Sequence, residues 1–276
     1  RDWSSDVCSS DLFFRKQPSW LHPIESIIFR CMIKMLFFFW SLSVLCAQPT
    51  AQEVLRRAEN NQRGKTSEAE MIIKTVRPSW KREMTLKAWL KGDDLAVLQI
   101  LSPVRDRGII YLKRNKEVWN WIPVLERIIK LPPSMMSQDW MGTDFTHDDL
   151  VHESSIVNEY THSFDPDTLI GERSCYMIRC VPFSTTAVIW GLLRIAIDKE
   201  QMLERYVEFY DDSEQKLSYM VADSVRNMGG RVVPTRLIYQ RIDKPGQHTE
   251  ILYRTLRFDE PISDAFFSLD KIRKLQ

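Results

Sequence analysis

The chain has 276 residues, of which 44% are hydrophobic and 27% are charged, and its formal net charge is +1 at pH 7. The part that follows Ala47 carries 33 basic and 33 acidic residues, so its net charge is zero. Nucleic-acid binding depends on a basic excess that this chain lacks. These values exclude nucleic acid as the expected partner and fit one folded domain, because no linker or repeat divides the chain.

The first twelve residues, RDWSSDVCSSDL, resemble a sequencing adapter translated in one reading frame. Residues 13–31 would then be upstream sequence read through to a false start. We therefore leave residues 1–31 out of the fold prediction as an artefact. The alternative is a genuine long N-terminus with a membrane anchor.

The stretch MIKMLFFFWSLSVLCAQPTAQ begins at Met32 and contains the most apolar run of the chain. Residues 35–47 carry no charge, but these thirteen residues are fewer than the roughly 20 that a bilayer-spanning helix needs. A lysine before a short apolar core, with small and polar residues after it, is typical of a secretory signal peptide. We expect residues 32–51 to be a signal peptide, residues 52–276 to form one domain, and the mature protein to lie in the periplasm.

The mature chain opens with a helical pattern and then changes to strand patterns. In AQEVLRRAENN, residues 51–61, Val54, Leu55 and Ala58 fall on one helical face. In EMTLKAWLKG, residues 83–92, apolar and polar side chains then alternate with a period of two. Such alternation predicts a half-buried antiparallel strand.

Eleven further stretches with a strand pattern are separated by short turn signals. They cover residues 68–76, 95–101, 108–114, 117–123, 126–132, 174–183, 192–198, 203–211, 216–225, 232–241 and 248–258. Many strands with short turns and no helix between them predict one large antiparallel sheet, a sandwich or a barrel. Two regions break the pattern: residues 132–152, rich in Met and aromatic side chains, and PISDAFFSL, with Pro261 at an expected helix start.

Two cysteines, Cys175 and Cys180, remain after removal of the signal peptide. On one strand, five residues span about 16 Å at 3.3 Å each. Bridged cysteines need Cα atoms within about 7 Å, and these two side chains would point to opposite faces. We expect both thiols to be unpaired and partly buried.

The stretch DFTHDDL gathers four residues of metal-binding type: Asp144, His147, Asp148 and Asp149. The favoured interpretation is helix capping, with Thr146 as N-cap and the aspartates in the first turn, where the helix dipole stabilises them. We therefore expect no metal and no cofactor. Ser134, Ser137 and Cys175 lie in no nucleophile motif, and no phosphate-binding glycine loop is present, so we expect no enzyme.

Five tryptophans lie within about sixty residues of one another: Trp80, Trp89, Trp119, Trp121 and Trp140. Tryptophan bands on β-proteins bind sugars or nucleic acid by stacking, and ordinary core packing is the alternative for each ring. Met135, Met136 and Met141 surround the last tryptophan, outside the strand pattern. Methionine adapts to irregular apolar partners, which favours a mobile apolar surface here.

A signal peptide, the helix EVLRRAENN, the strands EAEMIIKTVRPSWKREMTLKAWLKG and the segment VWNWIPVLERIIKLPPSMMSQDWMGTDFTHDDL together resemble the outer-membrane lipoprotein-sorting (LolA-like) proteins. The resemblance covers nearly all of residues 51–270. It implies a mainly β (α+β) fold: a half-open, strongly bent antiparallel β-barrel of about eleven strands, with helices as a lid over the concave apolar face.

The resemblance also implies the activity and the partners. The protein would be a monomeric periplasmic carrier that binds acyl chains of lipoproteins or lipids without covalent chemistry, and sorts them to the outer membrane. Its partners would be an inner-membrane transporter and an outer-membrane acceptor. Two alternatives stay open: a lipid-sensing or accessory module that acts with an inner-membrane transporter or signalling protein, and a hydrolase whose triad the sequence does not reveal.

The expected ligand-binding residues line the apolar cavity or belong to the lid: Trp119, Trp121, Met135, Met136, Trp140, Met141, Phe145 and Leu150. The prolines before Met135 stop the preceding strand, because proline donates no ladder hydrogen bond. A helix after them would place Met136 and Trp140 roughly 40° apart on one face. The alternative is that these side chains fill a static core.

We expect the exported protein to begin between Ala47 and Gln52 and to carry no lipid on Cys46. The apolar core is short, and Leu45 is bulky where a lipoprotein signal has a small residue. Intact-mass measurement of the exported form checks both statements. An added diacylglyceryl mass would contradict the interpretation as a free carrier.

Overall fold

The computed structural model describes residues 48–147, 149, 156–186 and 188–275. The adapter-like segment and residues 32–47 of the expected signal peptide lie outside the described residues. The following account concerns the compact unit Pro49–Gln276. Among the described residues, no helix is both long and apolar enough to cross a bilayer.

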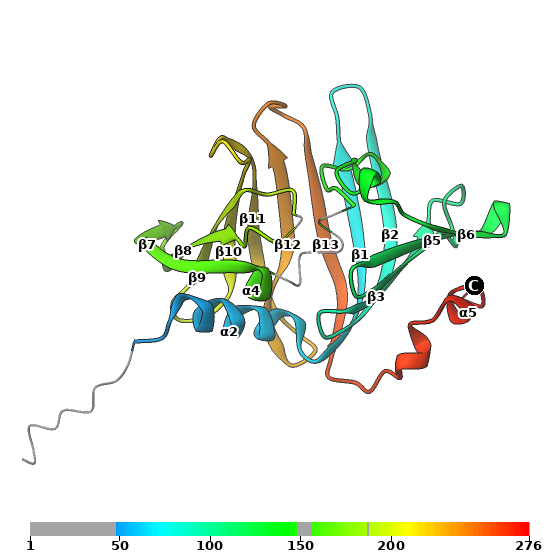
Figure 1. Cartoon of the computed structure of the whole chain (residues 1–276), viewed down its shortest axis with the longest axis horizontal. Helices are drawn as coiled ribbons and strands as arrows, with labels where there is room; N and C mark the ends of the chain where they lie inside the picture. The colour runs from blue at the N-terminus through cyan, green and yellow to red at the C-terminus, as the bar shows by residue number, and fades with distance from the viewer. Residues whose placement is uncertain (1–47, 148, 150–155, 187, 276) are drawn as a thin grey trace, which may run out of the picture. The chain divides into compact units, whose positions relative to one another are not determined.

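One antiparallel sheet contains all thirteen strands of the described part (Figure 1). The strands are β1 Thr66–Val76, β2 Lys81–Lys91, β3 Leu95–Ser102, β4 Ile110–Arg114, β5 Glu117–Ile122, β6 Arg127–Lys130, β7 Tyr160–Ile170, β8 Arg173–Pro182, β9 Leu192–Asp198, β10 Glu204–Tyr210, β11 Lys216–Met228, β12 Arg231–Arg241 and β13 His248–Phe258. Their order is β6-β5-β4-β3-β2-β1-β13-β12-β11-β10-β9-β8-β7. Strands β6 and β7 are the two edges, so the sheet is not closed.

The twelve stretches with a strand pattern each form a strand, and the prediction of an antiparallel sheet is confirmed. The expected number of about eleven strands is wrong. The missed strand is β7, whose centre, Asp165-Pro166-Asp167, has the composition of a turn. The pairing of β7 with β8 is irregular between Asp165 and Thr168, so the proline sits in a bulge of an edge strand, where its missing N–H is tolerated.

The predicted first helix is confirmed as α2, Ala51–Arg63. Thr50 caps it, because the Glu53 N–H donates to Thr50 Oγ1 and the Thr50 N–H donates to the Glu53 carboxylate. One face of α2 is buried: Ala51, Val54, Leu55 and Ala58. The remaining described helices are single turns: η1 Pro123–Leu125, η2 Pro133–Met135, η3 Trp140–Gly142, α4 Ile156–Glu159, η4 Asp264–Phe266 and α5 Leu269–Ile272.

The chain after β13 does not start a helix at Pro261, so this expectation is wrong. Residues 260–263 are irregular, and the first turn, η4, begins at Asp264. The Lys91 ammonium donates to the Ile262 carbonyl at 2.8 Å, which holds this stretch against β2. Beyond it, Phe267 and Ile272 are fully buried against Trp89 and Val97.

Cys175 and Cys180 both lie on β8, and both are free and buried. Cys175 packs with Met177 and Ala196, whereas Cys180 belongs to the large cluster that contains Ile178. Their odd spacing places them on opposite faces of the strand, as expected. Burial raises the pKa of both thiols.

We expect neither thiol to react with iodoacetamide in the native protein at neutral pH, since a buried thiol with a raised pKa contains little thiolate. Both should be alkylated after unfolding without reductant. Peptide mapping of the labelled protein measures this. A peptide with Cys175 bridged to Cys180 would mean that the segment is not the strand seen here.

Candidate functional site

The widest apolar surface of the unit is a continuous row of side chains on one face of the sheet. The strand register pairs Ile178 with Ile195, Val207 with Ile195 and Met220 with Val207. The row continues through Met220–Tyr239, Leu237–Ile251, Ile73–Ile251 and Ile73–Met84. We call this surface, which crosses eight strands from β8 to β2 and continues through Ile100, Tyr111 and Val118 of β3–β5, the apolar face.

Two segments cover the apolar face. The buried residues of α2 pack on the β8–β12 half, whose members include Ile195 and Leu237. Residues 131–147, named here the covering segment, pack on the half that β1–β4 form. Ile251 and Tyr253 of β13 contact both halves, so the two covers meet over one apolar surface. Figure 1 shows α2 across β9–β12 and the turns of the covering segment beside β1 and β2.

The covering segment is irregular and contains no α-helix. It consists of the turns η2 and η3 and one isolated bridge between Asp139 and Thr146. Trp140 is fully buried, and its ring meets Tyr111 of β4 edge-on at 5.8 Å between centroids. Met135, Met136 and Met141 are partly buried around it.

An ion pair fixes the covering segment to the middle of the sheet. Arg77, just after β1, donates to the Asp144 carboxylate at 3.0 Å and to the Gly142 carbonyl at 3.1 Å. The Asp144 side chain is 1% exposed, and it also accepts from the Thr249 hydroxyl at 2.6 Å. The Asp144 N–H in turn donates to Thr249 Oγ1 at 2.9 Å. Asp144 is thus held by a guanidinium from the residue that follows β1 and by a threonine of the neighbouring strand β13.

A second arginine holds the segment at Met141. Arg82 of β2 donates to the Met141 carbonyl at 3.0 Å and pairs with Asp106 at 2.6 Å. Met141 has a φ of 52°, a left-handed conformation that is uncommon for a residue with a Cβ. The Tyr111 hydroxyl also lies 3.5 Å from the Met141 sulfur. Arg82 therefore fixes a backbone conformation that methionine would rarely adopt alone.

The capping interpretation of DFTHDDL agrees with the contacts at the end of the covering segment. The Thr146 N–H and hydroxyl lie 2.7 and 2.9 Å from Asp149 Oδ2, and the Asp149 N–H donates to Thr146 Oγ1 at 3.1 Å. These are the reciprocal bonds of a capping box. Asp149 Oδ1 also accepts from the Trp190 indole N–H at 2.9 Å. The described residues contain no group of three or more His, Cys, Asp or Glu placed to hold a metal.

The structure brings together five of the eight expected ligand-binding residues. Met135, Met136, Trp140 and Met141 pack on one half of the apolar face, and Phe145 packs on Tyr239 of the other half at 5.1 Å. The other two described candidates, Trp119 and Trp121, lie on the opposite face of the sheet. Leu150 lies outside the described residues.

The opposite face has its own cover. The register pairs Trp89 with Val97, Val97 with Leu112 and Leu112 with Trp119. The C-terminal turns η4 and α5 pack on this row, and Phe266 meets the Trp89 ring at 5.2 Å. Trp119 and Trp121 therefore belong to a core beneath the C-terminal segment, away from the covering segment.

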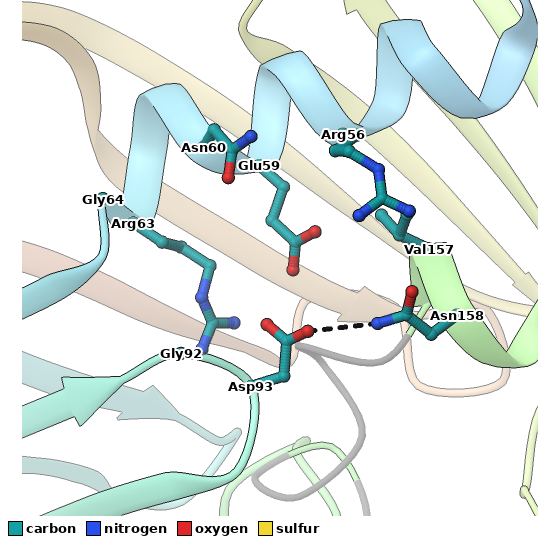
Figure 2. Close-up of a pocket in the computed structure, with 9 residues that line it drawn as sticks. All are labelled: Arg56, Glu59, Asn60, Arg63, Gly64, Gly92, Asp93, Val157 and Asn158. Carbon is teal, nitrogen blue, oxygen red and sulfur yellow. Dashed lines mark hydrogen bonds between the residues drawn. The ribbon is translucent and has the colours of Figure 1, made fainter.

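A polar pocket of about 70 Å³ lies between α2, the β2–β3 turn and α4 (Figure 2). Arg56, Glu59 and Arg63 reach into it from α2, and Asp93 faces them from the turn. Asn158 of α4 donates to Asp93 at 3.1 Å. The pocket is small and its lining is charged, so it does not suit an acyl chain.

These features define the class of fold. A LolA superfamily protein from Nitrosomonas europaea matches with a TM-score of 0.70 at 19% identity, over 81% of this chain and 99% of that chain. An outer membrane lipoprotein-sorting protein domain from Vibrio parahaemolyticus matches with a TM-score of 0.72 at 16% identity, over 81% and 98%. A DUF1329 family protein from Desulfovibrio piger gives 0.73 at 16%, over 80% and 97%. The chain has the LolA-like fold.

The sequence itself identifies the family. Residues 92–274 match the model of a family described as "Uncharacterized protein", and the chain belongs to this family. A comparison with curated proteins gives no significant match. The matches at 16 to 19% identity establish the fold alone, so the function has to be argued from the apolar face and its covers.

We expect Arg77→Met to lower the free energy of unfolding by about 3 kcal/mol, because it leaves the buried Asp144 carboxylate without its counter-charge. In an Asp144→Asn background the same change should cost only about 1 kcal/mol, since no charge is then stranded. Urea unfolding of the four proteins of this double-mutant cycle gives the coupling.

The matched control is Lys74 and Glu83, which pair at 3.6 Å across the same hairpin with both side chains exposed. The cycle of Lys74→Met and Glu83→Gln should give a coupling of about 0–1 kcal/mol. Equal coupling in the two cycles would show that the Asp144 ion pair does not anchor the covering segment.

Proposed function

We propose that the protein is a periplasmic carrier that binds the acyl chains of lipoproteins or lipids on the apolar face, beneath the covering segment. The observation that carries this proposal is the cover itself. An apolar row across eight strands is covered on one half by an irregular, methionine-rich segment, which Arg77, Arg82 and Thr249 hold to the sheet by hydrogen bonds.

The bend of the sheet would make the apolar face concave, so that an acyl chain lies along it with the covering segment as lid. Each buried CH₂ contributes roughly 0.8 kcal/mol, so a sixteen-carbon chain gains on the order of 12 kcal/mol before costs. Binding of this kind needs apolar area and no covalent chemistry. The buried Cys175 and Cys180 fit that view, because their raised pKa values make them poor nucleophiles.

Release requires that the emptied surface be covered again. Exposed apolar area on the sheet would promote association with other chains, so the lid has to close when the acyl chain leaves. Three partly buried methionines suit this exchange, since an unbranched thioether packs against either the sheet or an acyl chain. An inner-membrane transporter as donor and an outer-membrane acceptor would complete the transfer.

Fully buried Trp140 and the partly buried methionines have different parts in this proposal. Trp140 lies against Tyr111 and acts as the fixed end of the lid. Met135 and Met136 sit in the turn η2 and just after it, and they form the part that moves. Phe145 reaches Tyr239 on the other half of the apolar face, so the lid spans both halves.

We expect Met135→Ser with Met136→Ser to weaken binding of a fluorescent fatty acid about tenfold, because the loss of two partly buried methionine contacts corresponds to a few kcal/mol at most. The free energy of unfolding should fall by no more than about 2 kcal/mol, since both side chains remain partly exposed. Fluorescence titration and urea unfolding of the same preparations measure the two quantities.

Met84→Ser is the matched control, because Met84 is fully buried in the sheet below the covering segment. It should cost about 2–5 kcal/mol of stability, as other changes at buried methionines do. If the Met135 and Met136 variant binds the fatty acid as the unaltered protein does, yet loses as much stability as Met84→Ser, the covering segment is a static core and the lid is ruled out.

A further inference from the structure

Three of the four most exposed large apolar side chains of the described residues lie at one end of the sheet. Val124 is 88% exposed, Val104 is 81% exposed and Leu125 is 57% exposed. Val104 lies in the connection between β3 and β4, and the other two lie in η1, between β5 and β6. Of the other large apolar side chains described, only Leu169, on the opposite edge strand β7, is comparably exposed.

The two connections lie next to each other. Strands β4 and β5 pair from Ile110, which follows the first connection, to Trp121, which precedes the second. A methyl group on Gly108 would lie 3.2 Å from Pro123 Cγ, so the two backbones are in contact range. Figure 1 shows both connections at the β5–β6 end of the sheet. We call Val104, Val124 and Leu125 together the apolar tip.

Basic side chains surround the apolar tip. Arg105, Arg107 and Arg127 are exposed in the same two connections or directly after them. The acidic groups there are Asp106, which is buried and paired with Arg82, and Glu126. With Arg82 included, four arginines stand against two carboxylates. This leaves two positive charges at this end of a protein whose mature part is neutral.

The C-terminal segment adds charge of the same sign. The Leu275 carbonyl accepts from the Gln99 amide at 3.4 Å, and Gln99 pairs with Ile110, the first residue of β4. The exposed basic residues of this segment are Lys271, Arg273 and Lys274, and its exposed acids are Asp270 and Asp264, the latter paired with Lys91. Two segments far apart in sequence thus bring basic groups to the β3–β4 end.

We propose that the apolar tip and its basic surround dock the protein on an anionic lipid surface. Three exposed aliphatic side chains flanked by arginines match both parts of such a surface: the apolar groups enter the interface, and the cations attract the phosphates. The three side chains lie in connections between strands, and each is more than half exposed, which leaves them free to enter a lipid interface. The inference concerns docking only and holds whether or not the apolar face carries an acyl chain.

The test is co-sedimentation of the mature chain with vesicles of equal parts phosphatidylglycerol and phosphatidylcholine, and with vesicles of phosphatidylcholine alone. The unaltered protein should prefer the anionic vesicles and should dissociate as ionic strength rises. Val124→Ser with Leu125→Ser should weaken partitioning about tenfold, because two aliphatic side chains no longer enter the interface. Arg105→Gln with Arg107→Gln should reduce the dependence on salt.

Leu169→Ser with Val232→Ser is the matched control, since both side chains are exposed elsewhere in the sheet, at 70% and 47%. It should partition as the unaltered protein does. Absence of binding to anionic vesicles, equal binding to both vesicles, or equal effects of the tip and control variants would overturn the proposal. Fatty-acid binding by the tip variant should be unchanged, which separates failure of docking from failure of the carrier function.

Discussion

The constraint on which this structure depends is the apolar face of an open sheet. The strand register aligns aliphatic and aromatic side chains in one row from β8 to β2. The row must be shielded by other parts of the chain, because β6 and β7 do not pair and no second sheet packs on it among the described residues. The helix α2 and the covering segment supply this shield, and each covers one half of the row.

The two covers meet the constraint in different ways. Helix α2 has a regular apolar stripe of four buried residues and a complete N-cap, so its own hydrogen bonds are satisfied before it packs. The covering segment has no such internal order. Its position depends on Arg77 and Arg82, which bind its carbonyls and its one buried carboxylate, Asp144. Apolar contacts stabilise the covering segment but do not specify its position on the sheet. The ion pair between Arg77 and Asp144 specifies that position.

The elements that depend on local pattern were predictable from the sequence. Alternation of apolar side chains gave twelve strands, and the 3.6-residue period gave α2, because each of these patterns is the direct imprint of one buried face. Strand β7 was not predicted, because Pro166 and its flanking aspartates occupy a bulge that breaks the alternation of apolar and polar side chains. The same alternation separates Val118, on the apolar face, from Trp119 on the opposite face, so grouping Trp119 with Trp140 neglected the strand period.

No local sequence pattern predicts the contacts of Arg77, Asp144 and Thr249 that hold the covering segment. Arg77 and Asp144 are 67 residues apart, and Thr249 is a further 105 residues from Asp144. A threonine on a strand and an arginine at a turn are common anywhere in a β-protein, and only the strand order β2-β1-β13 brings them to one carboxylate. Long-range polar pairs of this kind follow from topology, which a single sequence does not fix.

Arg82 connects the two surfaces to which we assign functions. Its guanidinium donates to the Met141 carbonyl of the covering segment and to Asp106, which lies between Arg105 and Arg107 of the basic surround of the tip. The Arg105 guanidinium reaches Asp106 as well, at 3.4 Å. The two bonds of Arg82 use different guanidinium nitrogens, so this side chain holds Asp106 and the Met141 carbonyl at the same time. One arginine therefore joins the basic surround of the apolar tip to the covering segment, so the two surfaces that we propose for docking and for acyl-chain binding are physically linked.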